Sequence, residues 1–328
     1  MTDRPVLIVG AGPTGLVLAL WLTRLGISVR IIDKTAEPGT TSRALAVQAR
    51  TLEFYHQVGL TDAVIAGGVK IANLNFWVKG ARAARVPLQR LGEGLSPYPF
   101  ALVFPQDAHK RLLIEQLDAL GVRVERQTEL LRFEQHDSGV RAVLRRLDGS
   151  EEICEAAYLA GCDGASSTVR GELAIGFPGG TYTGLFYVAD VDATGPATDD
   201  EPHIDLEDVD FLVVFPLQGR GRVRLIGTVR DLPGGDHDTL TFDDVKGKAM
   251  ERLKLSIAKV KVLDLSCPPP RRASPPRGAC VPARRCRAHP QPGRRPRDEH
   301  GHRRRRKPRV EARRRPERRC PGQPAGHL

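Results

Sequence analysis

The sequence lacks a long apolar run, a paired set of cysteines and any abundance of aromatic side chains, which make up 5% of its residues. No stretch of about 18 apolar residues is present to span a bilayer, and the apolar segment 5–10 is too short for a secretion signal. Only Cys154 and Cys162 precede residue 267, and the later cysteines lack the spacing of zinc ligands. We therefore expect a cytoplasmic protein without a membrane span, a disulfide framework or a metal site.

Most of the chain also lacks a net positive charge, although the net charge of the whole is +11. Residues 267–328 hold 20 Lys and Arg against 4 Asp and Glu, so residues 1–266 carry a net charge of −5. An excess of positive charge ordinarily indicates an anionic partner such as nucleic acid. Because the body of the chain is mildly acidic, we expect no specific nucleic-acid partner for it.

Residues 5–33 have the pattern of a strand, a glycine-rich turn, a helix and a second strand. The apolar run 6–9 predicts the first strand, and residues 29–33 predict the second. Between them lies Gly10-Ala11-Gly12-Pro13-Thr14-Gly15, which has the spacing of a dinucleotide-binding turn in the expected context. This segment therefore predicts a Rossmann-like βαβ unit.

The chemistry of a dinucleotide explains each residue type in that turn. Gly10 permits the tight turn, Gly12 lets the backbone approach a pyrophosphate, and Gly15 allows the helix to pack closely on the strand. Pro13, within the same turn, is also expected to be a cofactor-binding residue. Free amides at the start of the helix attract the phosphate charge. Asp33 ends the second strand, where its carboxylate can accept hydrogen bonds from a ribose and would repel a 2′-phosphate. The site therefore suits FAD or NAD rather than NADP.

Other patterns predict the rest of the fold. Residues 109–120 have helical periodicity and 122–124 have the pattern of a strand, whereas Pro and Gly interrupt 70–105 into short strands or loops. Residues 177–262 mainly alternate as strands do, with one helical exception at 243–255. We expect an α/β fold in which a β-rich layer follows the nucleotide-binding domain.

Three segments in order resemble the class A flavoprotein monooxygenases, the family of para-hydroxybenzoate and phenol hydroxylases. Tyr158–Arg170 resembles the Asp-Gly motif of that family, with Asp163 and Gly164 as the named pair. Residues 42–53 resemble the segment of that family that follows the second strand and carries an FAD-contacting arginine. Phe104-Pro105-Gln106-Asp107 resembles the family segment that carries an FAD-contacting glutamine. The resemblance covers about 1–266.

The resemblance implies a cofactor, a reaction and further site residues. Arg43 and Gln106 would contact FAD, and Asp163 and Gly164 would lie where flavin and nicotinamide approach each other. In this family NAD(P)H reduces the flavin, and dioxygen then supplies one oxygen atom to an electron-rich aromatic ring. The partners would be a small aromatic substrate and O2. Because the cofactor carries the chemistry, no catalytic side chain is assigned, and His56 and His109 are interpreted as solvated or packed histidines.

Two alternatives share the glycine-rich turn. An NAD-dependent dehydrogenase would use the same βαβ unit but has no use for the Asp163 segment. A non-catalytic protein that binds nucleotides and polyanions would use the arginine run 303–307, which lacks interleaved aromatic residues.

The segment 267–328 has the composition of a disordered tail. It contains 13 of the 25 prolines and no aromatic residue, so it cannot bury enough apolar surface to offset its loss of conformational entropy. The resemblance would place a third FAD motif, Gly-Asp, near Arg284, where it is absent. Codons read one base later from Arg284 to His302 permit that motif, which indicates a change of reading frame soon after Ser266. Without the late strand, we expect an unpaired sheet edge and weaker FAD binding.

These arguments divide the chain into three parts. We expect an FAD-binding domain at 1–175, with 71–105 as an insertion over the substrate site. An incomplete β-rich substrate domain follows at 176–266, and the disordered Arg- and Pro-rich tail occupies 267–328.

Overall fold

A computed structural model describes the following residues: 4–39, 44–88, 92–177, 179–180, 185–206, 211–229, 241–266, 271–272 and 279–282. Arg43 and the arginine run 303–307 lie outside these ranges, so the expectations for them have no structural counterpart here. Within the described part, no helix is long and apolar enough to cross a membrane.

The first sheet carries the expected βαβ unit and confirms it. Its five strands run in the order β20 (Ala279–Pro282), β12 (Tyr158–Gly161), β1 (Val6–Val9), β2 (Val29–Ile32) and β8 (Val124–Glu125). Strand β1 is central and pairs in parallel with β12 and β2. All four of its residues are buried, as a central parallel strand requires.

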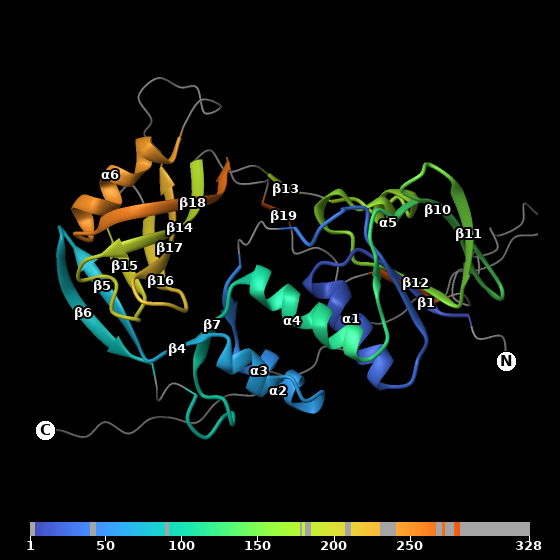
Figure 1. Cartoon of the computed structure of the whole chain (residues 1–328), viewed down its shortest axis with the longest axis horizontal. Helices are drawn as coiled ribbons and strands as arrows, with labels where there is room; N and C mark the ends of the chain where they lie inside the picture. Colours follow the sequence, from blue (N-terminus) through green and yellow to red (C-terminus); the bar gives the residue numbers. More distant parts are fainter. Residues whose placement is uncertain are drawn as a thin grey trace, which may run out of the picture. The chain divides into compact units, whose positions relative to one another are not determined.

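Two helices pack together on this part of the fold. Helix α1 (Pro13–Arg24) follows β1 directly, and α4 (Gln106–Ala119) lies beside it (Figure 1). Leu16 and Leu20 of α1 and Leu113 and Leu117 of α4 are fully buried in one cluster with Ile8. The i, i+4 spacing of these leucines places them on one face of each helix, which confirms the helix predicted from residue 109 onward.

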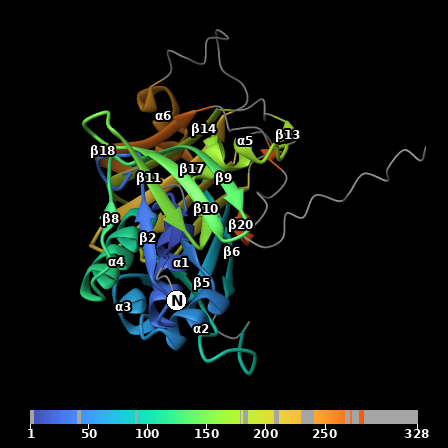
Figure 2. The same ribbon diagram turned by 90° about the vertical axis from the view of Figure 1, so that its right-hand side faces the viewer.

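A three-stranded antiparallel sheet follows β8 and was not predicted from the sequence. It contains β9 (Glu129–His136), β10 (Gly139–Arg145) and β11 (Glu151–Ala156), which lie next to one another in Figure 2. Leu130, Val140 and Leu144 from this sheet are buried with Leu7 and Leu159 of the first sheet. The small sheet therefore covers apolar side chains that β1 and β12 would otherwise expose.

The connection from β2 to α4 forms a smaller layer. A second three-stranded sheet has the order β3 (Ala46–Val47), β7 (Ala101–Val103) and β4 (Val69–Ile71). Two helices, α2 (Ala49–Gln57) and α3 (Thr61–Ala66), lie between β3 and β4 in the chain.

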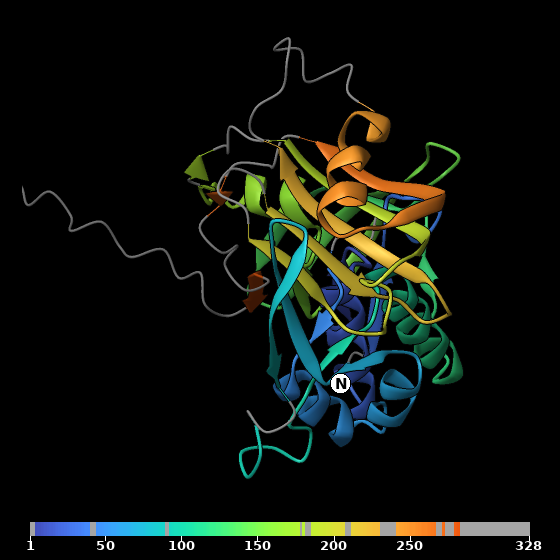
Figure 3. The same ribbon diagram turned by 90° about the vertical axis from the view of Figure 1, so that its left-hand side faces the viewer.

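The largest sheet has seven strands and contains the expected β-rich region. Its order is β18 (Ser256–Ser266), β14 (Leu185–Thr194), β17 (Arg222–Val229), β16 (Phe211–Pro216), β15 (His203–Leu206), β5 (Asn73–Val78) and β6 (Ala81–Pro87). Helix α6 (Phe242–Arg252) contacts β18, as Figure 3 shows in orange. The helix predicted at 243–255 is thus confirmed, ending a few residues earlier.

Strands β5 and β6 refine the expected division of the chain. The sequence assigned 71–105 to the first domain as an insertion, but β5 pairs in parallel with β15 and so belongs to the seven-stranded sheet. Polar contacts join β5 to β15 and to the residues just before it: Trp77 Nε1 donates to His203 Nδ1 over 2.9 Å, and Asn75 donates to Glu201. The boundary at residue 175 stays a prediction, whereas 73–87 share a sheet with residues more than a hundred positions later.

The remaining elements follow β12. A single 3-10 turn (Gly164–Ser166) leads to α5 (Thr168–Glu172), and β13 (Gly179–Gly180) pairs with β19 (Arg271–Arg272). Strand β20 pairs antiparallel with β12 at the edge of the first sheet. Strands β19 and β20 are therefore exceptions within the segment expected to be disordered. Because β20 pairs with β12, the expectation that loss of the late strand leaves a sheet edge unpaired is wrong. Backbone groups of an exposed edge accept almost any extended segment, whatever its side chains.

Candidate functional site

Two cavities flank the start of α1. The first has a volume of about 270 Å³, and five of the nine predicted cofactor residues line it: Gly10, Gly12, Asp33, Asp163 and Gly164. These residues come from the ends of β1, β2 and β12, which are parallel neighbours in one sheet. Because the carboxyl ends of parallel strands meet at one edge, residues far apart in sequence converge there.

The glycines of the turn have separate physical roles. Gly10 has φ +103°, and a Cβ on it would lie 2.5 Å from the carbonyl oxygen of Cys162. A Cβ on Gly15 would lie 1.9 Å from the carbonyl oxygen of Gly10, so this glycine lets the helix approach the turn. A Cβ on Gly12 would meet no protein atom within 4 Å, which leaves room for a ligand against the backbone. No side chain caps the helix at Gly12, so its first amides remain available to a diphosphate.

Asp33 is fixed by hydrogen bonds at the rim of the first cavity. Its Oδ2 accepts from the amide of Ala11 over 2.7 Å, and its Oδ1 accepts from the amide and hydroxyl of Thr35 over 2.9 and 2.7 Å. Arg126 Nη1 lies 3.8 Å from the same Oδ1. Burial raises the pKa of the Asp33 carboxyl, but these hydrogen bonds and the nearby charge outweigh it, so the pKa is lowered overall. The group is therefore an anion that can accept from a ribose.

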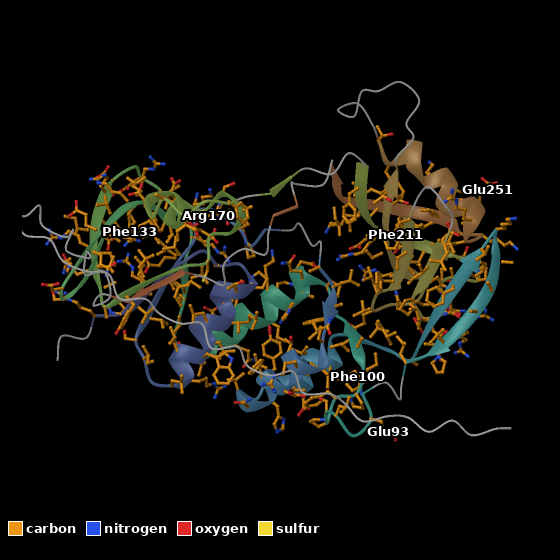
Figure 4. The ribbon with its side chains drawn as sticks, turned by 180° about the vertical axis from the view of Figure 1, so that it is seen from behind. Glu93, Phe100, Phe133, Arg170, Phe211 and Glu251 are labelled. Atoms are coloured by element: carbon orange, nitrogen blue, oxygen red, sulfur yellow. The ribbon has the colours of Figure 1, made fainter. Side chains whose placement is uncertain are left out.

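The Asp163 carboxylate shapes the loop in which it lies. Its Oδ1 accepts from the Ser167 hydroxyl over 2.6 Å, and its Oδ2 accepts from the Val169 amide over 3.2 Å. Arg170, labelled in Figure 4, donates to the carbonyl oxygen of Gly164 over 3.0 Å, and its guanidinium lies 4.1 Å from the centre of the Phe177 ring. These contacts hold Gly164, at φ +72°, against the first cavity.

The second cavity has a volume of about 400 Å³ and brings in two more predicted residues, Pro13 and Gln106. The amide of Gln106 donates to the carbonyl oxygen of Ala44 over 3.1 Å, which joins α4 to the segment after Arg43. The other lining residues of the second cavity include Thr14, Val17, Ala46, Val47, Thr51, Tyr55, Phe104 and His109. Arg43 itself lies outside the described residues, although its neighbour Ala44 lines this cavity.

The geometry fits a dinucleotide cofactor. An open glycine backbone, an uncapped helix start and a carboxylate at the end of β2 are the groups that hold a diphosphate and a ribose. In the described part of the chain, no three His, Cys, Asp or Glu side chains are close enough together to hold a metal ion.

A comparison with protein families identifies which dinucleotide this is. Residues 3–266 match a family described as an FAD binding domain. The chain belongs to this family. Its cofactor is therefore FAD, and the alternative of an NAD-dependent dehydrogenase is not favoured. The matched range ends at the residue after which the sequence indicated a change of reading frame.

Relatives of this FAD-binding chain include monooxygenases. It is 37% identical over 239 residues to 6-methylpretetramide 4-monooxygenase of Streptomyces rimosus, which covers 73% of this chain and 42% of that protein. It is 32% identical over 243 residues to pentachlorophenol 4-monooxygenase of Sphingobium chlorophenolicum, covering 73% and 44%. The chain thus spans less than half the length of these curated relatives.

Solved structures of monooxygenases share the fold of this FAD-binding chain. The flavin-dependent monooxygenase PieE, solved in complex with FAD and substrate, has a TM-score of 0.67 and 26% identity over 79% of this chain and 49% of that one. The p-nitrophenol 4-monooxygenase PnpA of Pseudomonas putida DLL-E4 has a TM-score of 0.68 at 21% identity, covering 79% and 67%. The mixed α/β fold is therefore that of FAD-dependent monooxygenases.

Replacing Asp33 by asparagine tests the role of its charge in this FAD-binding chain. The amide keeps an acceptor for Thr35 but loses the negative charge that favours ribose hydroxyls. We expect affinity for 5′-ADP to fall about tenfold, whereas affinity for 2′,5′-ADP should rise relative to it because repulsion of the 2′-phosphate is removed. Calorimetric titration of both nucleotides measures the ratio. An unchanged ratio would show that Asp33 does not face the adenosine ribose.

Sequence reasoning missed a pair of side chains in the second cavity. Tyr55 Oη and His109 Nε2 lie 2.6 Å apart, and Tyr55 is only 2% exposed. Burial lowers the pKa of His109 to about 4 and raises the pKa of Tyr55 above its ordinary value, so both groups are neutral at pH 7. The two residues are 54 positions apart, and no local pattern could have paired them.

The lowered pKa of His109 makes stability depend on pH. As the pH falls, the unfolded chain takes up this proton near the ordinary pKa of 6.5, whereas the folded chain resists it until about 4. The stability that His109 contributes is thus fully present above pH 6.5 and is lost as the pH falls from 6.5 to about 4. We expect the free energy of unfolding to fall by about 2 kcal/mol through this residue between pH 7 and about pH 5. Urea unfolding at both pH values should show a shallower loss in His109→Gln; an identical loss would contradict the assignment.

Proposed function

We propose that this chain is the FAD-binding part of a monooxygenase that places one oxygen atom from dioxygen on an aromatic, phenol-like ring, with NAD(P)H as the electron donor. The observation that carries the proposal is the FAD-family match over residues 3–266 together with the convergence of Gly10, Gly12 and Asp33 on one cavity. The curated relatives named above act, by name, on a pretetramide and on pentachlorophenol, and both names support an aromatic substrate class.

The residues of the chain bind and orient, and bound FAD supplies the redox chemistry. The amides that follow Gly12 would hold the diphosphate, and Asp33 would accept from the adenosine ribose. Gln106 would donate from the second cavity, and Arg43 is proposed as a further contact on the basis of its place in the sequence. Asp163 and Arg170 would keep Gly164 in the conformation that borders the first cavity.

The proposal extends to location and partners. The partners are a small aromatic molecule, dioxygen and NAD(P)H, with no specific nucleic acid, and we propose a cytoplasmic location because these co-substrates are available there. We propose that the FAD-binding part ends at residue 175 and the β-rich part at residue 266. Strands β5 and β6 lie within the first range of residues but belong to the sheet of the β-rich part.

The test is consumption of NADH or NADPH by the purified chain with added FAD, measured with and without a panel of substituted phenols. We expect phenols to stimulate the consumption of NADH or NADPH together with the uptake of oxygen. The products should be heavier by one oxygen atom in mass spectrometry. A chain that binds FAD but forms no hydroxylated product with any phenol, even when its reading frame after Ser266 is corrected, would overturn the aromatic substrate class.

A further inference from the structure

The Tyr55–His109 pair offers the second cavity a hydrogen-bond donor in a fixed position. His109 lies one helical turn after Gln106 on α4, so both side chains are on one face of the helix, and both line the cavity. The imidazole contacts two aromatic rings: the centre of the Tyr55 ring is 5.4 Å away at an interplanar angle of 87°, and that of the Phe104 ring is 5.4 Å away at 41°. These two contacts restrict the orientation of the histidine ring.

The hydrogen bond with Tyr55 also decides where the imidazole proton lies. Tyr55 is buried, and His109 is the one partner of its hydroxyl among the described side chains. The hydroxyl is assigned as the donor to Nε2, because no other acceptor for this O–H is present among the described side chains and an unsatisfied buried O–H is costly. A neutral imidazole whose Nε2 accepts carries its proton on Nδ1. His109 thus presents an Nδ1–H group.

That Nδ1–H has no acceptor among the residues that the structure describes. It is also not one of the fully buried side-chain atoms that lack a hydrogen-bond partner, so it is accessible from the cavity. FAD is rich in acceptors, with phosphate, hydroxyl and carbonyl oxygens along its length. We propose that His109 is a further cofactor-binding residue, whose Nδ1–H donates to an oxygen of FAD in the second cavity, and that Tyr55 is the positioning residue that fixes the tautomer. This inference rests on the proposed placement of FAD along both cavities.

Two substitutions of His109 separate the two nitrogens. In His109→Asn the amide group takes the position of Nδ1 and loses the contact with Tyr55. In His109→Gln the amide reaches the position of Nε2, keeps that contact and leaves Nδ1 without a replacement. FAD affinity of the full chain is measured by quenching of flavin fluorescence, and 5′-ADP affinity by calorimetry serves as a report on the first cavity alone.

We expect His109→Gln to weaken FAD binding about tenfold, the ordinary effect of one lost hydrogen bond, and His109→Asn to stay within about threefold of the unchanged chain. Tyr55→Phe should give an intermediate loss because the ring then adopts either tautomer. Affinity for 5′-ADP should not change in any of the three. If His109 only supported the packing of α4, the order would reverse, because asparagine abandons the contact with Tyr55.

The chain contains a matched control. Tyr98 Oη and His56 Nδ1 form a similar pair 2.9 Å apart, but His56 is exposed and neither residue lines a cavity beside α1. We expect Tyr98→Phe and His56→Gln to leave FAD affinity unchanged. Equal FAD affinity of His109→Gln and the unchanged chain, or a parallel loss of 5′-ADP affinity, would overturn the role of His109. An unchanged chain that bound 5′-ADP and no FAD would overturn the placement of FAD as well.

Discussion

Replacing Gly15 by alanine is expected to destabilise the folded chain by about 3 kcal/mol or more. In an ordinary helix the same change would stabilise by about 1 kcal/mol, because alanine has the higher helix propensity. Here the new Cβ would lie 1.9 Å from the carbonyl oxygen of Gly10, and the other close atoms are Gly10 backbone and the side chain of Cys162. Backbone at this contact cannot give way without moving β1 from α1. The steric cost therefore exceeds the gain in propensity.

Gly12→Ala is the matched control, and we expect the opposite pattern. Gly12 has φ −73°, which alanine adopts freely, and its Cβ would meet no protein atom within 4 Å. The free energy of unfolding without ligand should change by less than about 0.5 kcal/mol, whereas FAD affinity should fall more than about tenfold because the methyl group occupies the space of the diphosphate. Urea unfolding and fluorescence titration measure the two effects. Similar stability losses in both variants would contradict this division of roles.

The part of the site that the sequence predicted is the part encoded within a short stretch of chain. Gly10 to Asp33 form one βαβ unit, so glycine spacing and strand periodicity were enough to place the turn, the helix and the carboxylate together. Gln106 came from the family resemblance and Pro13 from the glycine-rich turn, and the structure brings both to the second cavity. Whether these side chains contact FAD stays a prediction.

Features that depend on long-range pairing could not be read in the same way. The sheet β9–β11 covers apolar residues of β1 and β12, and its alternation alone does not say which surface it covers. Strand β5 pairs with β15 in parallel across more than a hundred residues, and such a pairing leaves no local signal. His109 was interpreted as a solvated or packed histidine because it lies in a helical segment, and nothing in the sequence indicated that Tyr55 of α2 would lie beside it.

The carboxylate of Asp163 has contacts within its own loop that the sequence did not predict. The sequence named it a cofactor residue, and it does line the first cavity. Both of its carboxylate oxygens, however, accept hydrogen bonds from the loop and the start of α5. Gly164 has a positive φ, and a Cβ on it would meet no protein atom within 4 Å, so it is the residue of the pair that leaves space for a ligand. Asp163 therefore fixes the loop that Gly164 needs.

A chain translated one base later after Ser266 is expected to bind FAD at least about tenfold more tightly than the present chain. The change would restore a Gly-Asp segment from Arg284 onward and with it the groups that the family resemblance assigns to the pyrophosphate and the ribityl chain. At present the outer edge of β12 is paired with Ala279–Pro282, in antiparallel register. Edge pairing of this kind needs only backbone groups, so it satisfies the strand without supplying cofactor contacts. Flavin absorbance of the two purified proteins after gel filtration measures the difference.

Deletion of residues 267–328 separates this explanation from a role for the tail as a polyanion-binding arm. If the tail contributes only non-specific charge, its removal should abolish salt-sensitive binding to polyanions and leave FAD affinity within about threefold of the present chain. The frame-corrected protein should exceed both in FAD affinity. Equal flavin content in all three proteins would mean that the two cavities beside α1 hold FAD without a late strand. It would also mean that the present tail does not weaken FAD binding.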